Sequence, residues 1–387
     1  MKKILIVNNN MHIGGVQKAL VSLLWAIRKH YDVTLLLFYK GGQCLQDLPP
    51  EIKVIESHCA YRYLGMTKYD PLSRWEKLGR SFFAAITRLF GRDAAIKLMS
   101  VGQKQLSGYD VAISYLHNGA NKAFYGGCND FVLNHVPAKK KITFLHCDYL
   151  DCGANTRQNA RQYARFDAVA ACSQGCADRF LQALPQLAPK VTVVPNCHRF
   201  DDIVRQADTA PVTLSEKINI VTVARLGKEK GVERAVRAVG RMGAAGEKLH
   251  YYIIGDGIQK PLLQQIIKEE KLEDRVTLCG MLKNPYGYIR SADLLLIPSY
   301  SEAAPLVIGE AACLGTPVLS TETSSAVEMI AEKDLGWVCP NSEDALLSAL
   351  ETLVKQPGQI ANKKEKLAKA VQNNEMATAQ FAQITEF

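Results

Sequence analysis

Two glutamates, eight positions apart, are the residues of this sequence best suited to binding a polar ligand. Glu302 precedes a predicted short helix and Glu310 lies within it. The apolar run Leu294–Ile297 before them and the run Pro317–Ser320 after them predict the order strand, loop, helix, strand. Such a unit points the free N–H groups of a helix N-terminus at an anion beyond the strand end. Carboxylates on both sides of that point predict a nucleotide-sugar site.

Two cations follow a second predicted strand, Ile218–Ala224. Arg225 comes directly after it and Lys230 lies five positions further on, before the next predicted helix. Ligands bind at the carboxyl edge of parallel sheets, and paired cations there neutralise the charge that builds up on a departing phosphate oxygen. By itself a Lys-Glu-Lys run is more typical of a solvated loop. Together with the glutamate pair it indicates a diphosphate site.

Each carboxylate also has a structural explanation. Glu310 lies among Ile308, Ala311 and Ala312, so a partly buried carboxylate is expected there. Ribose hydroxyls or a structural salt bridge would each give it a partner. Glu302, just before Pro305, either contacts a sugar or only complements the helix dipole.

Further candidates lie at other strand ends. His146 follows the predicted strand Ile142–Leu145 and stands next to Cys147-Asp148, so it either contacts substrate or is structural. Gly14 and Gly15 open the first helix and allow an anion to approach the backbone, and Gly255 begins a second tight turn. The Gly-x-Gly-x-x-Gly spacing of a dinucleotide site does not occur here, which counts against a dehydrogenase. We expect no metal and no cofactor, because no Asp-x-Asp pair ends a strand.

Length, composition and charge limit the number of domains and the class of protein. The chain has 387 residues, is 48% hydrophobic and 22% charged, and carries a net charge of +9, which predicts a folded protein of two domains. Eleven scattered cysteines and a first strand in place of a signal peptide favour a cytoplasmic protein with reduced thiols. The first 200 residues are strongly basic, which would suit nucleic acid, an anionic membrane surface or an acidic substrate. Of these we expect the membrane surface or the substrate, and no nucleic acid.

Residues 73–106 have the spacing of an amphipathic helix. Its apolar positions are Trp75, Leu78, Phe82, Ile86 and Leu89, and its opposite face carries Lys77, Arg80, Arg88 and Arg92. Two interpretations stand equal: a helix that lies on an anionic membrane surface, or an ordinary helix that packs on the sheet of the first domain.

Continuous apolar strands that alternate with helical segments run along the whole chain, which predicts α/β domains with parallel sheets buried on both faces. A polar stretch at 196–217 is the expected linker. The expected division is an acceptor domain at 1–200, a donor domain at 218–365, and a helical segment at 366–387 that returns to the first domain. Both domains are expected to be doubly wound and to face a central cleft.

Taken in order, the motifs resemble the retaining glycosyltransferases of family 4, whose fold is the two-domain GT-B fold. The residues that carry this resemblance are Gly14-Gly15, His146 with Asp148, Val193–Asn196, Arg225 with Lys230-Gly231, Gly255-Asp256-Gly257, Ser291-Ala292-Asp293, Pro298-Ser299, Glu302, Glu310-Ala311 and Gly315–Val318. The resemblance covers nearly the whole chain.

The resemblance implies a role for each site residue. Arg225 and Lys230 would hold the donor diphosphate and assist its departure, Glu310 would bind the ribose, and Glu302 would face the transferred sugar. The backbone near Gly15 and Leu306 would touch phosphate or sugar, His146 would lie beside the reacting sugar, and Leu282 would lie against the base. The sequence departs from the family pattern at Ala303-Ala304-Pro305, where Gly-Phe-Gly is frequent, and at Gly309, where a larger apolar residue is usual.

The resemblance therefore implies a metal-independent retaining glycosyltransferase, a hexosyl or other sugar transferase. It would move a sugar from a nucleotide-diphosphate donor, a UDP-sugar, to a glycan or lipid-linked glycan in bacterial envelope, capsule or exopolysaccharide synthesis. Its expected place is the cytoplasm, as a peripheral protein at the inner face of the membrane. The alternatives are a sugar-nucleotide epimerase of the same fold and a non-catalytic partner subunit. The latter is expected to lose Arg225, Lys230 or Glu310, and all three are present.

Overall fold

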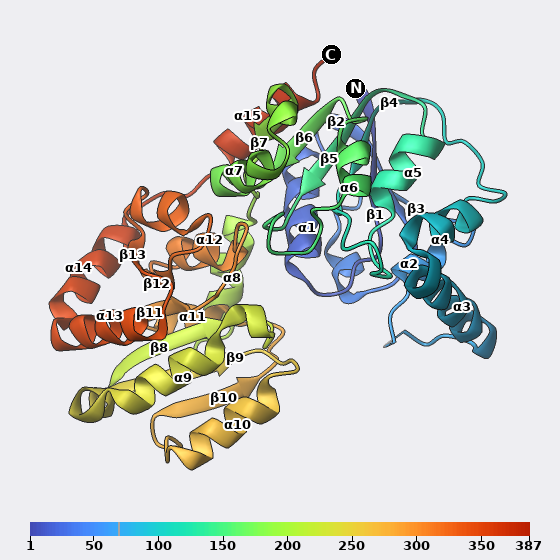
Figure 1. The fold of residues 1–387 in the computed structure, drawn as a ribbon. Helices are drawn as coiled ribbons and strands as arrows, with labels where there is room; N and C mark the ends of the chain where they lie inside the picture. Colours follow the sequence, from blue (N-terminus) through green and yellow to red (C-terminus); the bar gives the residue numbers. More distant parts are fainter. Residues whose placement is uncertain (69) are drawn as a thin grey trace. The chain divides into compact units, whose positions relative to one another are not determined.

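The computed structural model describes residues 1–68 and 70–387. The chain divides into two compact units: unit 1 contains Met1–Cys197 and Asn374–Phe387, and unit 2 contains His198–Asn373. Figure 1 shows one parallel sheet with covering helices in each unit. The sequence division was 1–200, 218–365 and 366–387, so the observed boundaries lie at other residues.

The linker expected at 196–217 is wrong over much of its length, because helix α8, Phe200–Thr209, forms there and belongs to unit 2. Its buried residues Ile203 and Ala207 are four positions apart and therefore share one face. Asp201 and Asp202 in its first turn favour the helix N-terminus electrostatically. Because most residues of this segment are polar, the two-residue apolar stripe was not recognised in the sequence.

The sheet of unit 1 has seven parallel strands in the order β3-β2-β1-β4-β5-β6-β7. Helices cover both faces of the sheet, which is why its strands are apolar on both sides. The strands are β1 Lys2–Asn8, β2 Tyr31–Leu37, β3 Lys53–Glu56, β4 Tyr109–Ser114, β5 Ala138–Leu145, β6 Ala168–Ala171 and β7 Val191–Val193. The helices are α1 Gly15–Ile27, α2 Arg62–Gly65, α3 Arg74–Phe90, α4 Arg92–Met99, α5 Cys128–His135, α6 Arg157–Tyr163, α7 Gln174–Ala183 and α15 Glu375–Ile384, with 3-10 turns at Gln43–Asp47 and Pro185–Lys190.

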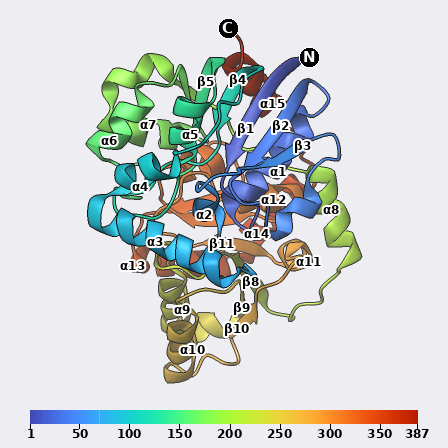
Figure 2. The same cartoon turned by 90° about the vertical axis from the view of Figure 1, so that its right-hand side faces the viewer.

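The last helix, α15, completes unit 1. Phe381 is fully buried and its ring meets that of Tyr31 edge-on, with 5.6 Å between the centroids. Lys2 Nζ donates a hydrogen bond to the carbonyl oxygen of Thr385 at 2.7 Å. The two chain ends accordingly lie side by side in Figures 1 and 2.

Unit 2 has six parallel strands in the order β10-β9-β8-β11-β12-β13. The strands are β8 Ile218–Val223, β9 Leu249–Ile254, β10 Val276–Gly280, β11 Leu294–Ile297, β12 Val318–Thr321 and β13 Gly336–Cys339. The other helices of this unit are α9 Val232–Arg241, α10 Lys260–Glu269, α11 Tyr286–Ser291, α12 Leu306–Cys313, α13 Glu343–Lys355 and α14 Pro357–Ala368, with single turns at Lys228–Lys230, Gly243–Lys248 and Val327–Ala331.

The strand order of unit 2 decides where a ligand can bind. After β8 the chain builds outward to β9 and β10, then returns so that β11 pairs with β8 on its other side. The loops that follow β8 and β11 therefore start from adjacent strand ends and run in opposite directions. Ligands of open parallel sheets bind at such a switch point. Among the described residues, no helix is long and apolar enough to cross a bilayer.

Candidate functional site

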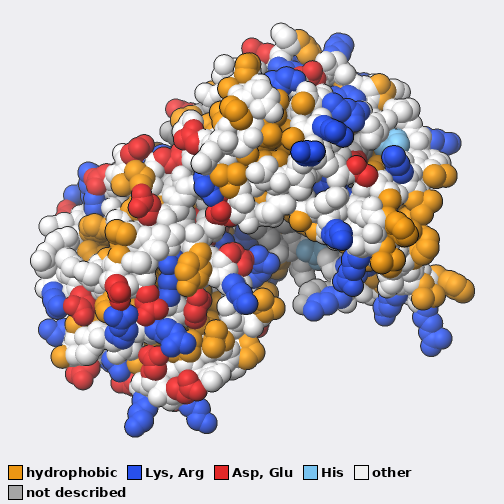
Figure 3. Space-filling view, viewed as in Figure 1, with side chains coloured by type: hydrophobic (Ala, Val, Ile, Leu, Met, Phe, Trp, Pro, Cys, Tyr) orange, Lys and Arg blue, Asp and Glu red, His pale blue; other side chains and the backbone are white. Residues whose placement is uncertain are grey.

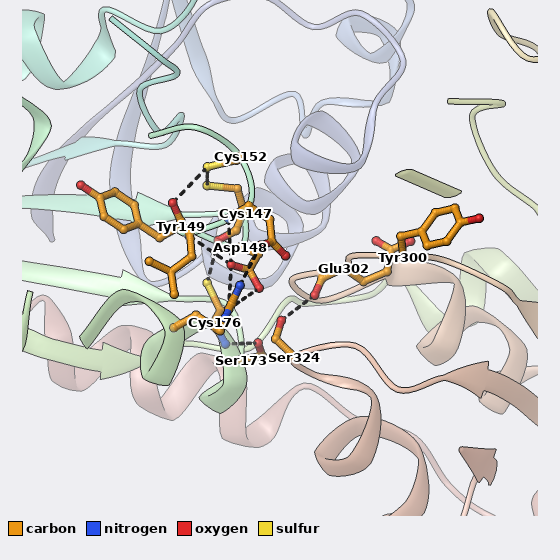
Figure 4. A network of polar contacts seen from close by, with 12 residues as sticks. Cys147, Asp148, Tyr149, Cys152, Ser173, Cys176, Tyr300, Glu302 and Ser324 are labelled. Atoms are coloured by element: carbon orange, nitrogen blue, oxygen red, sulfur yellow. Dashed lines mark hydrogen bonds and ion pairs between the residues drawn. The ribbon is translucent and has the colours of Figure 1, made fainter. Parts of the chain in front are cut away.

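The loops after β8 and β11 bring Lys230 and Glu302 together. Lys230 Nζ lies 2.7 Å from Glu302 Oε1, and the two side chains are 22% and 11% exposed. The hydroxyl of Ser299 also donates to Glu302 Oε1, at 2.7 Å. The hydroxyl of Ser324 donates to the backbone carbonyl of Glu302 at 2.8 Å, a contact visible in Figure 4. Both residues were predicted as site residues, and the structure makes them direct partners.

Arg225 lies on the same loop as Lys230 but is oriented differently. Its side chain is 76% exposed and its guanidinium pairs with Glu229, with 2.6 Å between Nη2 and Oε1. An exposed ion pair of this kind is worth about 0–1 kcal/mol. Arg225 can therefore exchange Glu229 for an anionic ligand at little cost in free energy.

Glu310 lies inside α12 and is 6% exposed. The hydroxyl of Tyr286, on α11, donates to Glu310 Oε1 at 3.2 Å. Burial, and then the neighbouring Glu310 carboxylate, raise the pKa of Tyr286. Within residues 1–68 and 70–387, the partner of Glu310 is a neutral hydroxyl and not the cation of a structural salt bridge. Its second oxygen can accept from a ligand hydroxyl.

The N-terminus of α12 has no side-chain cap: Pro305 precedes it without a capping hydrogen bond, and Leu306 is its first residue. The carbonyl oxygen of Leu306 lies 3.0 Å from His198 Nε2. The His198 ring also explains the unusual Gly309, because a Cβ at position 309 would lie 2.5 Å from Nε2 of that ring. The departure of Gly309 from the family pattern is therefore a packing effect next to the site.

Gly255 and Leu282 lie at the ends of the neighbouring strands β9 and β10. Gly255 has φ +149°, and a Cβ there would lie 1.8 Å from the carbonyl oxygen of Ala224. Glycine is thus required for the turn after β9 to pack against the start of the loop that carries Arg225. Leu282 is partly buried and packs on the core of unit 2, while the adjacent Met281 is 65% exposed.

In unit 1, Gly14 and Gly15 lie where β1 passes into α1. A Cβ at Gly15 would meet nothing within 4 Å, and one at Gly14 would meet only the flexible Gln17 side chain. Gly14 has φ −173°, an extended conformation that any residue adopts. Packing and backbone conformation therefore do not require glycine here, and the predicted close approach of an anion stays a prediction.

His146 follows β5 and is partly buried, with its Nε2 atom shielded from solvent. Its ring packs on Tyr115, with 4.6 Å between centroids, and burial lowers its pKa to about 3. His117, just beyond the neighbouring strand β4, is buried, and burial lowers its pKa to about 4. His146 Nε2 and His117 Nδ1 have no hydrogen-bond partner among residues 1–68 and 70–387. Sequence reasoning missed His117, because only the pairing of β4 with β5 brings the strand end before it next to the one before His146.

Asp148 was expected beside His146, but the structure pairs it with another residue. Arg179 Nε lies 2.9 Å from Asp148 Oδ2. Figure 4 shows Asp148 in a compact loop with Cys147 and Cys152, whose sulfur atoms are 3.0 Å apart. All eleven cysteines are free thiols. In the described part of the chain, no three His, Cys, Asp or Glu side chains are grouped as a metal site.

His117 and His146 predict an acid-sensitive fold. Each imidazole is neutral in the folded state down to a pKa of about 3 or 4, whereas in the unfolded chain it gains a proton below about 6.5. The unfolded state therefore binds more protons as pH falls through this window, and stability is lost. Between pH 7 and pH 5 we expect a loss of about 2 kcal/mol per histidine.

Urea denaturation of the full chain at pH 7 and pH 5 measures this effect. His117→Gln should reduce the loss between the two pH values, and the exposed His30→Gln should leave it unchanged. An equal pH dependence in wild type and His117→Gln would contradict the neutral, buried state of this imidazole.

Helix α3 leaves most of its predicted apolar stripe uncovered; only Ile86 is partly buried and packs on the core of unit 1. Trp75, Leu78, Phe82 and Leu89 are 80%, 60%, 55% and 72% exposed, whereas Phe83 and Thr87 face inward. Of the predicted basic face, Arg92 is wrongly placed, because it is 1% exposed and begins the next helix. The capping box of Ser73 and Glu76 and the positive φ of Gly91 fix the two ends of α3.

Comparison with known proteins finds a family model that matches part of the chain. Residues 205–374 match the family model described as glycosyl transferases group 1. The amylovoran biosynthesis glycosyltransferase AmsK of Erwinia amylovora is 32% identical over 145 residues, which are 35% of this chain and 36% of that protein. The N-acetylgalactosamine-N,N'-diacetylbacillosaminyl-diphospho-undecaprenol 4-alpha-N-acetylgalactosaminyltransferase of Campylobacter jejuni is 27% identical over 213 residues, 54% of this chain and 55% of that protein. The chain thus spans about a third to about half of the length of these curated relatives.

The fold has a counterpart over its whole length. The crystal structure of Anabaena HepE in complex with UDP matches with a TM-score of 0.67 over 99% of each chain, at 18% identity. This likeness confirms the predicted fold class, GT-B with two Rossmann-like domains.

Proposed function

We propose, on the premise that residues 205–374 form a domain of the group 1 glycosyl transferases, that the chain transfers a sugar from a nucleotide-diphosphate donor, a UDP-sugar, to a glycan or lipid-linked glycan. The process it serves is the synthesis of a bacterial envelope, capsule or exopolysaccharide. The observation that carries the proposal is the Lys230–Glu302 pair at the switch point between β8 and β11. A cation and a carboxylate in contact there suit a phosphate and the sugar bonded to it.

Each residue has a role in this proposal. Lys230 binds the diphosphate and stabilises the negative charge that grows on it as the sugar leaves, and Arg225 turns from Glu229 to add a second cation. Glu302 then exchanges Lys230 for hydroxyls of the transferred sugar. Glu310, held on one oxygen by Tyr286, accepts from the nucleotide ribose.

The names of related proteins support the choice of donor and acceptor. The Anabaena structure holds UDP. The name of the Campylobacter transferase describes an acceptor linked to diphospho-undecaprenol. The proposal extends to retention of the anomeric configuration, as the resemblance to family 4 implies, and to transfer without a divalent metal, with Lys230 and Arg225 as the positive charges at the diphosphate.

A panel of nucleotide sugars tests the function. The full chain is incubated with UDP-, GDP- and ADP-sugars, with and without an extract of bacterial lipid-linked glycans, and nucleotide release and glycan mass are followed. We expect release of UDP with one sugar added to the acceptor, unchanged by EDTA. Conversion of the donor to an isomer without transfer would point to an epimerase. If no donor is turned over, the proposal that the chain is an enzyme is refuted.

The exposed face of α3 gives the proposal a second part, contact with an anionic membrane surface at the cytoplasmic side. Figure 3 shows hydrophobic and basic side chains together at the α3 end of unit 1. Arg74, Lys77 and Arg88 are exposed on this helix beside Trp75 and Leu89. Apolar side chains that are uncovered and flanked by cations fit the interface of an anionic lipid bilayer. Such a position would bring the acceptor domain to a lipid-linked glycan.

Vesicle sedimentation tests this contact. Wild type should sediment with vesicles that contain phosphatidylglycerol and much less with pure phosphatidylcholine. Trp75→Ser combined with Leu89→Ser should reduce the bound fraction at least about tenfold, because two large side chains lose about 2 kcal/mol or more of transfer free energy. The exposed Ile258→Ser in unit 2 is the control. Equal binding of both vesicle types, or no loss in the double variant, would refute a docking role of α3.

A further inference from the structure

Arg234, on α9, is a buried cation whose hydrogen bonds within the described part of the chain go to two carbonyls and a hydroxyl and not to a carboxylate. It is 2% exposed, and burial lowers its pKa. Its Nε donates to the carbonyl oxygen of Pro298 at 2.8 Å, and its Nη2 donates to the carbonyl oxygen of Ser299 at 2.7 Å and to the hydroxyl of Thr321 at 3.1 Å. Burying a guanidinium costs several kcal/mol, which the hydrogen bonds that it donates must offset.

The part that Arg234 holds is the start of the loop after β11. Pro298, Ser299 and Tyr300 follow the strand without belonging to a helix or strand, so their carbonyl groups need partners from elsewhere. Arg234 supplies them at Pro298 and Ser299, and its guanidinium lies 4.0 Å from the centroid of the Tyr300 ring. The hydroxyl of Thr321, at the end of β12, also donates to the carbonyl of Ser299 at 2.6 Å.

Glu302 comes two residues after this clamped stretch. The backbone N–H of Tyr300 donates to the carbonyl of Glu229 at 2.9 Å, which ties the same loop to the segment that carries Lys230. Gly231 makes the approach possible: its φ is +57°, and a Cβ there would lie 2.1 Å from the carbonyl oxygen of Pro298. The five residues from Lys230 to Arg234 therefore supply both the cation of the ion pair and the clamp on the loop that carries its partner.

We propose that Arg234 is a positioning residue of the donor site, which fixes the loop from Pro298 to Glu302 so that the Glu302 carboxylate meets Lys230. The inference rests on the proposed function of that site. A guanidinium has a planar fork of donors that reaches two carbonyls and a hydroxyl at once, whereas a lysine ammonium on a flexible stem does not reproduce that geometry. A small displacement of a binding group lowers the rate of a reaction strongly.

The test compares two variants with two controls. Arg234→Lys keeps the positive charge and removes the planar fork of hydrogen-bond donors. Thr321→Val keeps a β-branched side chain in the strand and removes the hydroxyl between Arg234 and Ser299. We expect kcat/KM for the donor to fall at least about tenfold in Arg234→Lys, mostly in kcat, and less in Thr321→Val. Val239→Ala weakens the core of the same helix, and Arg241→Lys changes an exposed arginine of α9 bound to Glu343. Both controls should keep wild-type kinetics, and Val239→Ala should lower Tm.

Amide exchange without any substrate gives a second measurement. Residues 299–304 should exchange faster in Arg234→Lys and Thr321→Val, while the strands of unit 2 exchange as in wild type. Unchanged exchange there, wild-type kcat/KM in both folded variants, or an equal kinetic loss in Val239→Ala would overturn the positioning role. If wild type transfers no sugar, the proposed function fails, and the exchange measurement still decides whether Arg234 holds the loop.

Discussion

Lys230→Ala is expected to lower sugar transfer at least about 100-fold, because a cation is lost where negative charge develops on the departing diphosphate. The loss should be mainly in kcat, since the charge is greater in the transition state than in the bound donor. Lys230 is 22% exposed and makes one ion pair, with Glu302, so we expect a much smaller effect on folding. Circular dichroism and Tm verify the fold, and single-turnover nucleotide release measures the chemistry.

Lys228→Ala is the matched control, because Lys228 lies on the same turn and is exposed, whereas the contact with Glu302 is made by Lys230. It should release nucleotide at the wild-type rate. Lys230→Arg separates the effect of the charge from that of the side-chain geometry. A rate between those of wild type and Lys230→Ala indicates that the positive charge at this position matters. Near-normal turnover in Lys230→Ala refutes the role of Lys230 at the diphosphate.

Glu310→Ala is expected to weaken binding of UDP by about ten- to 100-fold, the value of hydrogen bonds between a carboxylate and ligand hydroxyls. Titration calorimetry with UDP measures the effect directly and needs neither the donor sugar nor the acceptor. The loss should be smaller for 2'-deoxy-UDP or 3'-deoxy-UDP, because those ligands have already lost a hydroxyl that the carboxylate would bind.

Two variants control for indirect effects. Tyr286→Phe removes the hydroxyl that donates to Glu310 and should change UDP affinity only a few-fold. Glu269→Gln removes an exposed carboxylate on α10 and should change nothing. If Tyr286→Phe reduces affinity as much as Glu310→Ala does, Glu310 acts by holding α11 and not by binding the ribose.

The membrane and donor parts of the proposal are independent of each other. The α3 double variant changes only side chains of unit 1, and the Lys230 and Glu310 variants change only unit 2. Loss of vesicle binding with normal turnover of a soluble acceptor would separate recruitment from catalysis. Vesicle binding that is retained in Lys230→Ala while transfer is lost would show that catalysis can be lost without loss of recruitment to the membrane.

Local sequence patterns determined much of the fold. Continuous apolar runs separated by helical periods predicted parallel strands buried on both faces, because a strand covered on both sides has no polar face. β8 and β11 lie at the predicted positions, and Glu302 and Glu310 do flank the start of α12. The pattern predicted α3 equally well, yet periodicity shows only which residues share a face. It does not reveal that the sheet leaves this face uncovered.

The order of the strands in each sheet could not be predicted from the sequence. Lys230 and Glu302 are 72 positions apart, and they meet because β11 returns to pair with β8. The clamp of Arg234 on Pro298 arises for the same reason, and so does the closeness of the strand ends that precede His117 and His146. The sequence by itself determined which residues stand at strand ends and which chemistry they carry. Only the tertiary structure decided which ends are neighbours, because pairing between distant strands depends on the packing of the whole sheet and not on local propensity.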